Sequence, residues 1–375
     1  MQKEDVMSLI AYLLMIGFAF AMGFGFVQPA IANGIFGRTG DKGAMFLFLF
    51  LSVVIGIILI ALLTELAHVI GAKLGKYEIL SVNIFGFCTY KTKEDDKIKN
   101  SFKFPRNFDG LTGETVIRPT SEKSKPIFYI FAPLFLFLLE VLTTVLLFLF
   151  FEDSTESADL MMMYVKYGSF IVTTIGGMVM IYNYFPSKLD NSNDGFKLIS
   201  LNKKSNIEAY NEYLRVNACV YFDENPGEIK KFDEINDFTA KVNMLSVNSL
   251  IESNYKEALA DIDTIVEDPS KITKSTFNNI MLTKAYILFM NEDLETAKNF
   301  YVTELNEEQR KMCVSCVTPI AIRVYLLYES LVEKSESEVE IAKSKIKKAV
   351  NKVPVAEQPR ERELLEEVIN KIENK

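Results

Sequence analysis

Four long apolar runs lie in the first half of the chain, whereas charged residues gather in the second half. The runs occupy residues 6–26, about 45–67, 127–151 and about 167–185. Each is close to the roughly 20 residues that an α-helix needs to cross a ~30 Å hydrocarbon core. The pattern therefore predicts a four-helix, multi-pass membrane domain over residues 1–200, followed by a soluble region over residues 201–375.

Basic residues predict the orientation of these helices. The connection at residues 68–126 is rich in Lys and Arg, whereas the connection after the third run carries Glu152, Asp153, Glu156 and Asp159 without any basic residue. Loops on the cytoplasmic side of a membrane carry an excess of Lys and Arg. We therefore expect the 68–126 connection, and with it both chain termini, to face the cytoplasm.

The cytoplasmic connection contains one stretch of alternating polarity. Tyr77–Phe87 alternates in the way a half-buried strand does, which predicts a small β element with an edge strand next to the membrane. The lysine-rich stretch Lys91–Lys103 follows it. We interpret this stretch as a solvated loop, with contact to anionic lipid headgroups as the alternative.

The soluble region is predicted to be all-helical and loosely repetitive. Residues 254–259, followed by Asp268-Pro269, resemble the second helix of a tetratricopeptide unit and its terminating proline, and weaker echoes lie at 285–297 and 321–349. Stacked helix pairs of this kind present a concave surface that binds peptides or proteins. We expect a tetratricopeptide-like domain that binds a cytoplasmic protein, and a plain helical bundle is the alternative.

The candidate chemistry begins with His68, the only histidine in the chain. It closes the pentapeptide Thr64-Glu65-Leu66-Ala67-His68 at the end of the second apolar run. The H-E-x-x-H motif of zinc proteases places two imidazoles on adjacent turns of one helix face, with the glutamate beside a metal-bound water. Here Thr64 stands where the first histidine of that motif belongs.

Further short motifs flank the other apolar runs. These are Phe131-Ala132-Pro133 in the third run, Asn183-Tyr184-Phe185-Pro186 and Asp194-Gly195 around the end of the fourth, and Gly86-Phe87 at the end of the alternating stretch. Both the residues of these motifs and their order along the chain, with their placement at predicted helix ends, bear on the comparison that follows. Together with the pentapeptide, they resemble the site-2 protease family of intramembrane zinc metalloproteases.

The resemblance implies a fold and a set of residue roles. The fold is mostly α, with a site-2-protease-type membrane core, and its metal ligands are His68 and Asp194, with Glu65 as the catalytic base. The same resemblance implies substrate-binding positions at Asn183, Pro186, Gly86 and Phe87. It also favours a bacterial plasma membrane as the location.

The ligand set is incomplete for a catalytic zinc, which normally takes three protein ligands and a water. One imidazole and one carboxylate remain, and the Thr64 hydroxyl is a poor donor. We therefore expect an inactive protein without a cofactor. The alternative is a divergent, active metalloprotease in which Asp190, Cys88 or Glu65 completes the zinc site. Without metal, Glu65, His68 and Asp194 are expected to form a buried polar cluster.

Other polar residues change the picture less. Glu140 lies within the third apolar run, where we expect it to hydrogen-bond to a neighbouring helix near Thr173 or Thr174, with a proton or substrate role as the alternative. Cys313 and Cys316 are interpreted as buried packing residues. The net charge of −8 argues against nucleic acid as a partner. The expected partners are membrane lipid, a peptide or transmembrane segment held in the remnant groove, and a cytoplasmic protein.

Overall fold

The computed structural model describes residues 3–28, 42–94, 97–106, 113–151, 157–186 and 193–374. The chain divides into two compact units, each made of several chain segments. The first contains residues 1–78, 110–115 and 123–202, and the second contains residues 79–109, 116–122 and 203–375.

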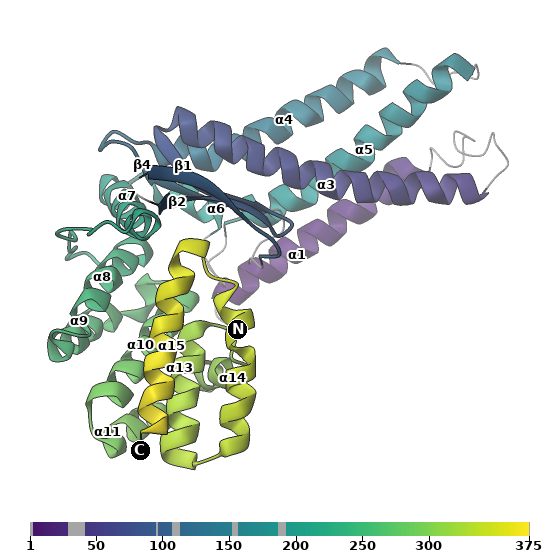
Figure 1. The fold of residues 1–375 in the computed structure, drawn as a ribbon. Helices are drawn as coiled ribbons and strands as arrows, with labels where there is room; N and C mark the ends of the chain where they lie inside the picture. The colour runs from purple at the N-terminus through teal and green to yellow at the C-terminus, as the bar shows by residue number, and fades with distance from the viewer. Residues whose placement is uncertain are drawn as a thin grey trace. The chain divides into compact units, whose positions relative to one another are not determined.

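Long apolar helices build the first unit (Figure 1). They are α1 (Lys3–Met22) with the π-helical turn η1 (Gly23–Val27), α3 (Lys42–Leu74), α4 (Pro126–Phe150) and α5 (Ser157–Tyr184), followed by the short α6 (Asp194–Ser200). Four described segments, one from each long helix, are long and apolar enough to cross a membrane, which confirms the count expected from the sequence. Side chains such as Phe46, Leu149 and Phe150 are 68–75% exposed, as lipid-facing residues are.

The helix boundaries differ from the hydropathy pattern in two places. The second predicted helix, 45–67, continues to Leu74, so that His68 lies almost two turns before its end. The fourth, 167–185, begins ten residues earlier, at Ser157. Both extensions contain polar residues, which end an apolar run in the sequence but not a helix whose polar side chains find partners.

Small residues bring these helices close together. A Cβ atom on Gly71 of α3 would lie 2.7 Å from the Cβ of Ala132 of α4. A Cβ on Gly176 of α5 would lie 3.0 Å from the ring of Phe137, and one on Gly177 would lie 2.7 Å from the ring of Phe18. Contacts this close exclude a larger residue, so the glycines act in helix packing.

A four-stranded sheet follows α3. Its strands are β1 (Tyr77–Ile84), β2 (Phe87–Glu94), β3 (Lys97–Lys103) and β4 (Gly113–Pro119), in the order β3-β2-β1-β4. Two predictions are wrong here. The 77–87 stretch forms an inner strand and a turn, since β1 pairs with β2 and lies between β2 and β4. Residues 91–94 and 97–103 form strands in place of a loop. Phe85 and Gly86 form the β1–β2 turn with positive φ angles of 51° and 85°, the conformation that tight hairpins require.

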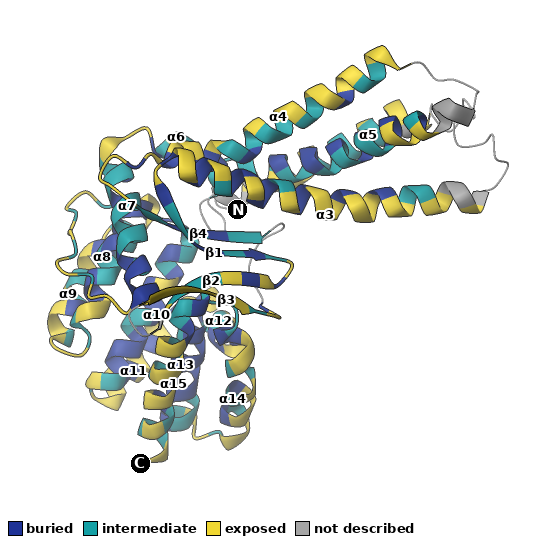
Figure 2. Cartoon of the chain, turned by 45° about the horizontal axis from the view of Figure 1, so that its top comes forward, coloured by how far each residue is buried: buried dark blue, intermediate teal, exposed yellow. Residues whose placement is uncertain are grey.

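The rest of the second unit is helical, as predicted (Figure 2). Its helices are α7 (Lys204–Cys219), α8 (Asp237–Leu250), α9 (Tyr255–Val266), α10 (Lys274–Asn291), α11 (Leu294–Asn299), α12 (Glu307–Ser315), α13 (Pro319–Tyr328), α14 (Glu336–Val350) and α15 (Gln358–Glu373). Helices adjacent in sequence pack together, and α10 and α13 supply the centre of the core. The assignment of these pairs to tetratricopeptide repeats remains a prediction.

Cys313 of α12 and Cys316, which follows the last residue of that helix, belong to this core. Cys313 and Cys316 are buried and carry free thiols. Cys316 ends the helix in the left-handed conformation, with φ at 53°. Their interpretation as packing residues is confirmed.

Candidate functional site

The pentapeptide of α3 presents three buried polar side chains toward the interior of the first unit. Thr64, Glu65 and His68 are only 4%, 2% and 8% exposed. The imidazole of His68 lies over the ring of Tyr129 from α4, with 4.6 Å between ring centres. Its Nδ1 atom lies 3.2 Å from the carbonyl oxygen of Tyr129, within hydrogen-bonding distance. The histidine is thus held between two helices.

Asp194 approaches this histidine from α6. Its Oδ2 atom lies 3.9 Å from Nε2 of His68, which confirms that the two residues meet. Its other oxygen, Oδ1, accepts a hydrogen bond of 3.1 Å from the ammonium of Lys197, one turn further along α6. The carboxylate therefore already has a cation beside it.

Two residues next to Asp194 fix where α6 begins. The side chain of Asn193 accepts a hydrogen bond from the backbone of Phe196 and donates to the carbonyl oxygens of Tyr182 and Phe185 at the end of α5. Gly195 lies so close to Tyr184 that a Cβ atom would collide with the Tyr184 carbonyl. Position 195 therefore requires glycine, because the backbone of α6 lies against Tyr184 there. This close approach brings Asp194 to α3.

Glu65 has a partner on the sheet. Thr115 of β4 donates a hydrogen bond of 2.6 Å to Oε2 of Glu65. The phenol of Tyr129 donates a bond of 2.9 Å to the carbonyl oxygen of Thr115, so that the same threonine is fixed from two sides. The carboxylate expected to act as catalytic base is therefore buried and held by a neutral donor.

These residues do not fit a catalytic zinc site. Within the described part of the chain, no group of three His, Cys, Asp or Glu side chains is placed to hold a metal ion. Thr64 offers only a hydroxyl, and the second donor, Asp194, is engaged with Lys197. Of the side chains considered for rescue, Cys88 belongs to the second unit and Asp190 lies outside the described residues.

Two cavities of the first unit adjoin the pentapeptide. One, beside Thr64, has a volume of only about 10 Å³, which is room for about one water molecule. The other is an apolar groove of about 360 Å³ between α3 and α4. Its lining residues are all apolar: Ala67, Ile70, Leu74, Ile127, Phe128, Phe131, Ala132, Phe135 and Leu136. A polar substrate finds no room beside Thr64, but an apolar segment finds a groove one turn away.

The four positions expected to bind substrate belong to different units. Asn183 and Pro186 lie at the end of α5, half-buried, in the first unit. Gly86 and Phe87 lie at the β1–β2 turn in the second unit, where the ring of Phe87 stacks on that of Phe104 at 4.3 Å. Within the first unit, the structure brings together His68, Asp194 and their unpredicted neighbours Lys197, Thr115 and Tyr129.

Some of these neighbours left a signal in the sequence. Lys197 follows Asp194 by three residues, a spacing that puts both on one helix face. Asn193 stands just before a helix start, where asparagine is a favoured cap. Thr115 and Tyr129 carry no such local signal, because each reaches the site through a contact between distant parts of the chain.

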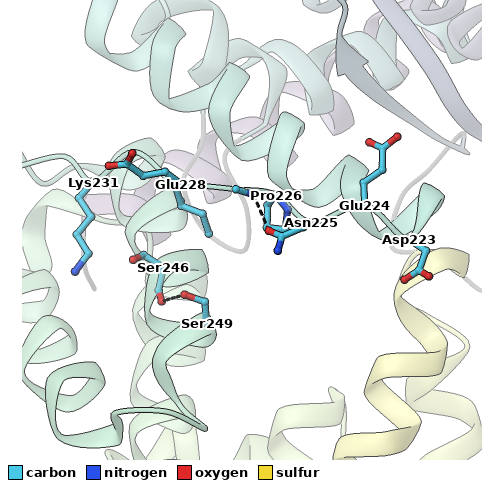
Figure 3. A pocket seen from close by; sticks show the side chains of 10 residues that line it. Asp223, Glu224, Asn225, Pro226, Glu228, Lys231, Ser246 and Ser249 are labelled. Atoms are coloured by element: carbon cyan, nitrogen blue, oxygen red, sulfur yellow. Dashed lines mark hydrogen bonds between the residues drawn. The ribbon is translucent and has the colours of Figure 1, made fainter.

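The helical part of the second unit has a separate, open basin of about 930 Å³ (Figure 3). Ser246 and Ser249 of α8 line it together with the loop at residues 223–231. Arg215 of α7 fixes this loop by donating to the carbonyl oxygens of Pro226 and Glu228. The basin is therefore a supported concave surface.

Acidic side chains outnumber basic ones around this basin. Glu224 pairs with Arg118 at 3.6 Å, and Lys231 pairs with Asp261 at 2.7 Å. Among the described residues, the carboxylates of Asp223 and Glu228 have no ion-pair partner, and both are exposed. The basin is therefore negatively charged.

The chain matches no protein-family model, no curated protein and no solved structure. The resemblance to site-2 proteases accordingly rests on the sequence motifs alone and remains a prediction.

Proposed function

We propose that the chain is a multi-pass membrane protein with a site-2-protease-like core that no longer cleaves. It holds a membrane-spanning or peptide segment beside α3 and recruits a cytoplasmic protein through its helical domain. The positive-inside pattern supports an orientation with both termini in the cytoplasm. The resemblance favours a bacterial plasma membrane as the location.

The observation that carries this proposal is the ion pair of Lys197 with Asp194. A zinc ion and an ammonium group both bind to the lone pairs of a carboxylate. The two cations would compete for Asp194 and repel each other at this distance. With Thr64 at the position of the first ligand, His68 alone is left to hold a metal. A site of this kind binds metal far more weakly than a complete one, because even changes around the ligands cost about 10- to 100-fold in affinity.

The groove between α3 and α4 supports the binding half of the proposal. Ile70, Phe128 and Phe135 are 44–55% exposed along it. A neighbouring apolar helix packs into a groove of this kind by close contact with side chains and small residues. Ala67 and Ala132 leave space at its base. We therefore assign the groove to the apolar segment of a membrane-anchored partner.

The negatively charged basin supports recruitment in the cytoplasm. Its exposed carboxylates, Asp223 and Glu228, favour a partner segment rich in Lys or Arg. Binding of a labelled oligolysine peptide to the full chain tests this. Asp223→Asn with Glu228→Gln should weaken binding about fivefold or more, and the control pair Glu304→Gln with Glu366→Gln, which changes net charge equally, should not. An equal loss in both would argue against a basin-specific partner.

The metal content of the detergent-purified protein tests the loss of activity. We expect no stoichiometric zinc in the wild type. About one tightly bound zinc per chain would contradict the proposal and favour the divergent enzyme. For that enzyme, Glu65→Gln should abolish processing of a membrane-anchored substrate while leaving protein abundance unchanged, because the catalytic base would be lost.

Site-specific photocrosslinking in cells tests the groove. A photoreactive phenylalanine at Phe135 should crosslink to a membrane-spanning segment identified by mass spectrometry. The matched control is Leu149, which is on the same helix and 71% exposed. If both positions give the same products, the groove does not select a partner.

A further inference from the structure

A line of hydroxyl groups joins α4 and α5 inside the first unit. Thr144 of α4 lies 2.6 Å from the hydroxyl of Ser169 and 2.8 Å from that of Thr173, both on α5. Thr173 in turn donates a hydrogen bond of 3.3 Å to Oε1 of Glu140, one turn back on α4. The oxygen atoms of Ser169, Thr144, Thr173 and Glu140 thus form one continuous hydrogen-bonded chain.

Glu140 is a carboxyl group within a membrane-length apolar helix. Among the described residues it has no cationic partner. Its polar neighbour is Thr173, which donates a hydrogen bond to it. An ionised carboxylate without a cation is costly in an apolar environment, whereas the protonated acid is tolerated. The group is therefore suited to hold a proton.

The water-sized cavity continues this chain toward α3. Glu140 and Thr64 both line it, and the other lining residues are apolar: Ile60, Leu63, Pro133, Leu136, Phe137 and Met180. Its volume of about 10 Å³ is close to what one water needs. The two polar groups on its wall supply the two hydrogen-bond partners that such a water requires.

We propose that Ser169, Thr144, Thr173, Glu140 and the cavity beside Thr64 form a proton relay through the first unit. A hydroxyl group both donates and accepts hydrogen bonds, so each can pass its proton to the next oxygen while it receives one from the previous oxygen. The protonated Glu140 gives its proton to a water in the cavity, and Thr173 then donates a proton to the Glu140 carboxylate that is left. At each link one O–H bond breaks as the next one forms, and rotation of the hydroxyls restores the chain, so that each cycle takes up one proton at Ser169 and leaves one on the water beside Thr64.

This relay goes beyond the proposed partner binding and rests only on the membrane placement of the four helices. Two neighbouring threonines provide matched controls. The hydroxyl of Thr143 donates to the carbonyl oxygen of Leu139, and that of Thr174 donates to that of Phe170, each four residues back on its own helix. They have the same chemistry as Thr144 and Thr173 on the same helices but are not members of the chain.

Proton flux into proteoliposomes of the full-length protein, driven by a potassium diffusion potential and read with a trapped pH-sensitive dye, tests the relay. We expect flux above that of empty liposomes, lost in Glu140→Gln and reduced about tenfold or more in Thr144→Val and Thr173→Val. Thr143→Val and Thr174→Val should conduct like the wild type. A second readout is modification of Glu140 by dicyclohexylcarbodiimide, which attacks protonated carboxyl groups in membranes and should slow as pH rises.

The contrary results are equally definite. Wild-type flux no higher than that of empty liposomes, or unchanged flux in Glu140→Gln, overturns the relay. Equal losses of proton flux in Thr143→Val and Thr144→Val also contradict the relay, because the hydroxyls would then serve only in helix packing. Zinc content and Phe135 crosslinking are measured separately, so failure of the relay leaves the proposed function standing.

Discussion

The ammonium of Lys197 lies 3.1 Å from Oδ1 of Asp194, on the side of the carboxylate away from His68. The pair is formed within one helix, so the two side chains come together as soon as α6 forms. The same carboxylate lies 3.9 Å from the imidazole. The positive charge that a metal would bring to this position is thereby supplied by the protein itself.

The first prediction concerns the recovery of metal binding. Thr64→His places two imidazoles on adjacent turns of α3, but zinc must still compete with Lys197 for Asp194. We therefore expect the double variant Thr64→His/Lys197→Met to bind zinc about tenfold more tightly than Thr64→His alone, measured by chelator competition. Lys204→Met, at a side chain that is 92% exposed, is the control second substitution. Equal zinc affinities for the two double variants would show that Lys197 does not compete.

The second prediction concerns the junction of α5 and α6. In Gly195→Ala the new methyl group would collide with the carbonyl of Tyr184, so α6 must move and draw Asp194 away from His68. We expect a loss of about 1–3 kcal/mol in stability, seen as a lower thermal unfolding temperature in detergent. Gly17→Ala is the control, because nothing lies within 4 Å of its added methyl group. A Gly195→Ala protein as stable as wild type would contradict this prediction and show that the backbone at the junction can shift at little cost.

The third prediction concerns acid stability of the helical region. Burial alone would raise the pKa of Asp237, but Lys241 at 2.9 Å and hydrogen bonds from Thr273 and Thr276 hold its pKa below the ordinary value. Since the folded-state pKa is lower than the unfolded one, this carboxylate stabilises the fold above the unfolded value of about 4. The stabilisation is lost as pH falls through the folded value.

Asp237→Asn should therefore cost about 1–3 kcal/mol at neutral pH and make the stability of α8 to α10 less dependent on pH below about 4. Hydrogen exchange of these helices in the full chain measures both effects. Asp268→Asn removes an exposed carboxylate nearby in the sequence and should have little effect at neutral pH. Identical pH profiles for Asp237→Asn and wild type would contradict the assignment.

The fourth prediction concerns cysteine reactivity. Burial raises the pKa of the Cys313 thiol to about 12, so almost none of it is the reactive thiolate at neutral pH. Burial also raises the pKa of Cys316. We expect neither thiol to react with iodoacetamide at pH 7.5 until the protein is unfolded, as measured by mass spectrometry. Rapid labelling of the folded chain would instead indicate a redox or metal-binding pair.

The sequence predicted the membrane helices well because each requirement is local. A run of about 20 apolar residues suffices to identify a span. It underestimated α3 because Glu65, His68 and Lys73 interrupt the apolar run, although the first two are buried. It also missed β2 and β3, because Lys and Thr alternate along residues 91–93, a composition that strands and solvated loops share.

The candidate site was predictable in its members but not in their bonds. The resemblance singled out His68 and Asp194, and the distance of 3.9 Å between Nε2 and Oδ2 confirms that the two side chains meet. The expected hydrogen bond from Thr173 to Glu140 is also confirmed, whereas Thr174 bonds to its own helix. The bond between Glu65 and Thr115 joins residues 50 positions apart, and no local pattern specifies it.

The amide of Asn193 ties the start of α6 to the last turn of α5 through two donated hydrogen bonds. Any rotation or piston movement of α5 must therefore carry α6 with it. Only residues 201–203 separate α6 from α7, the first helix of the following region. A displacement of α5 that moves α6 is therefore followed along the chain by a connection of only three residues before α7 begins.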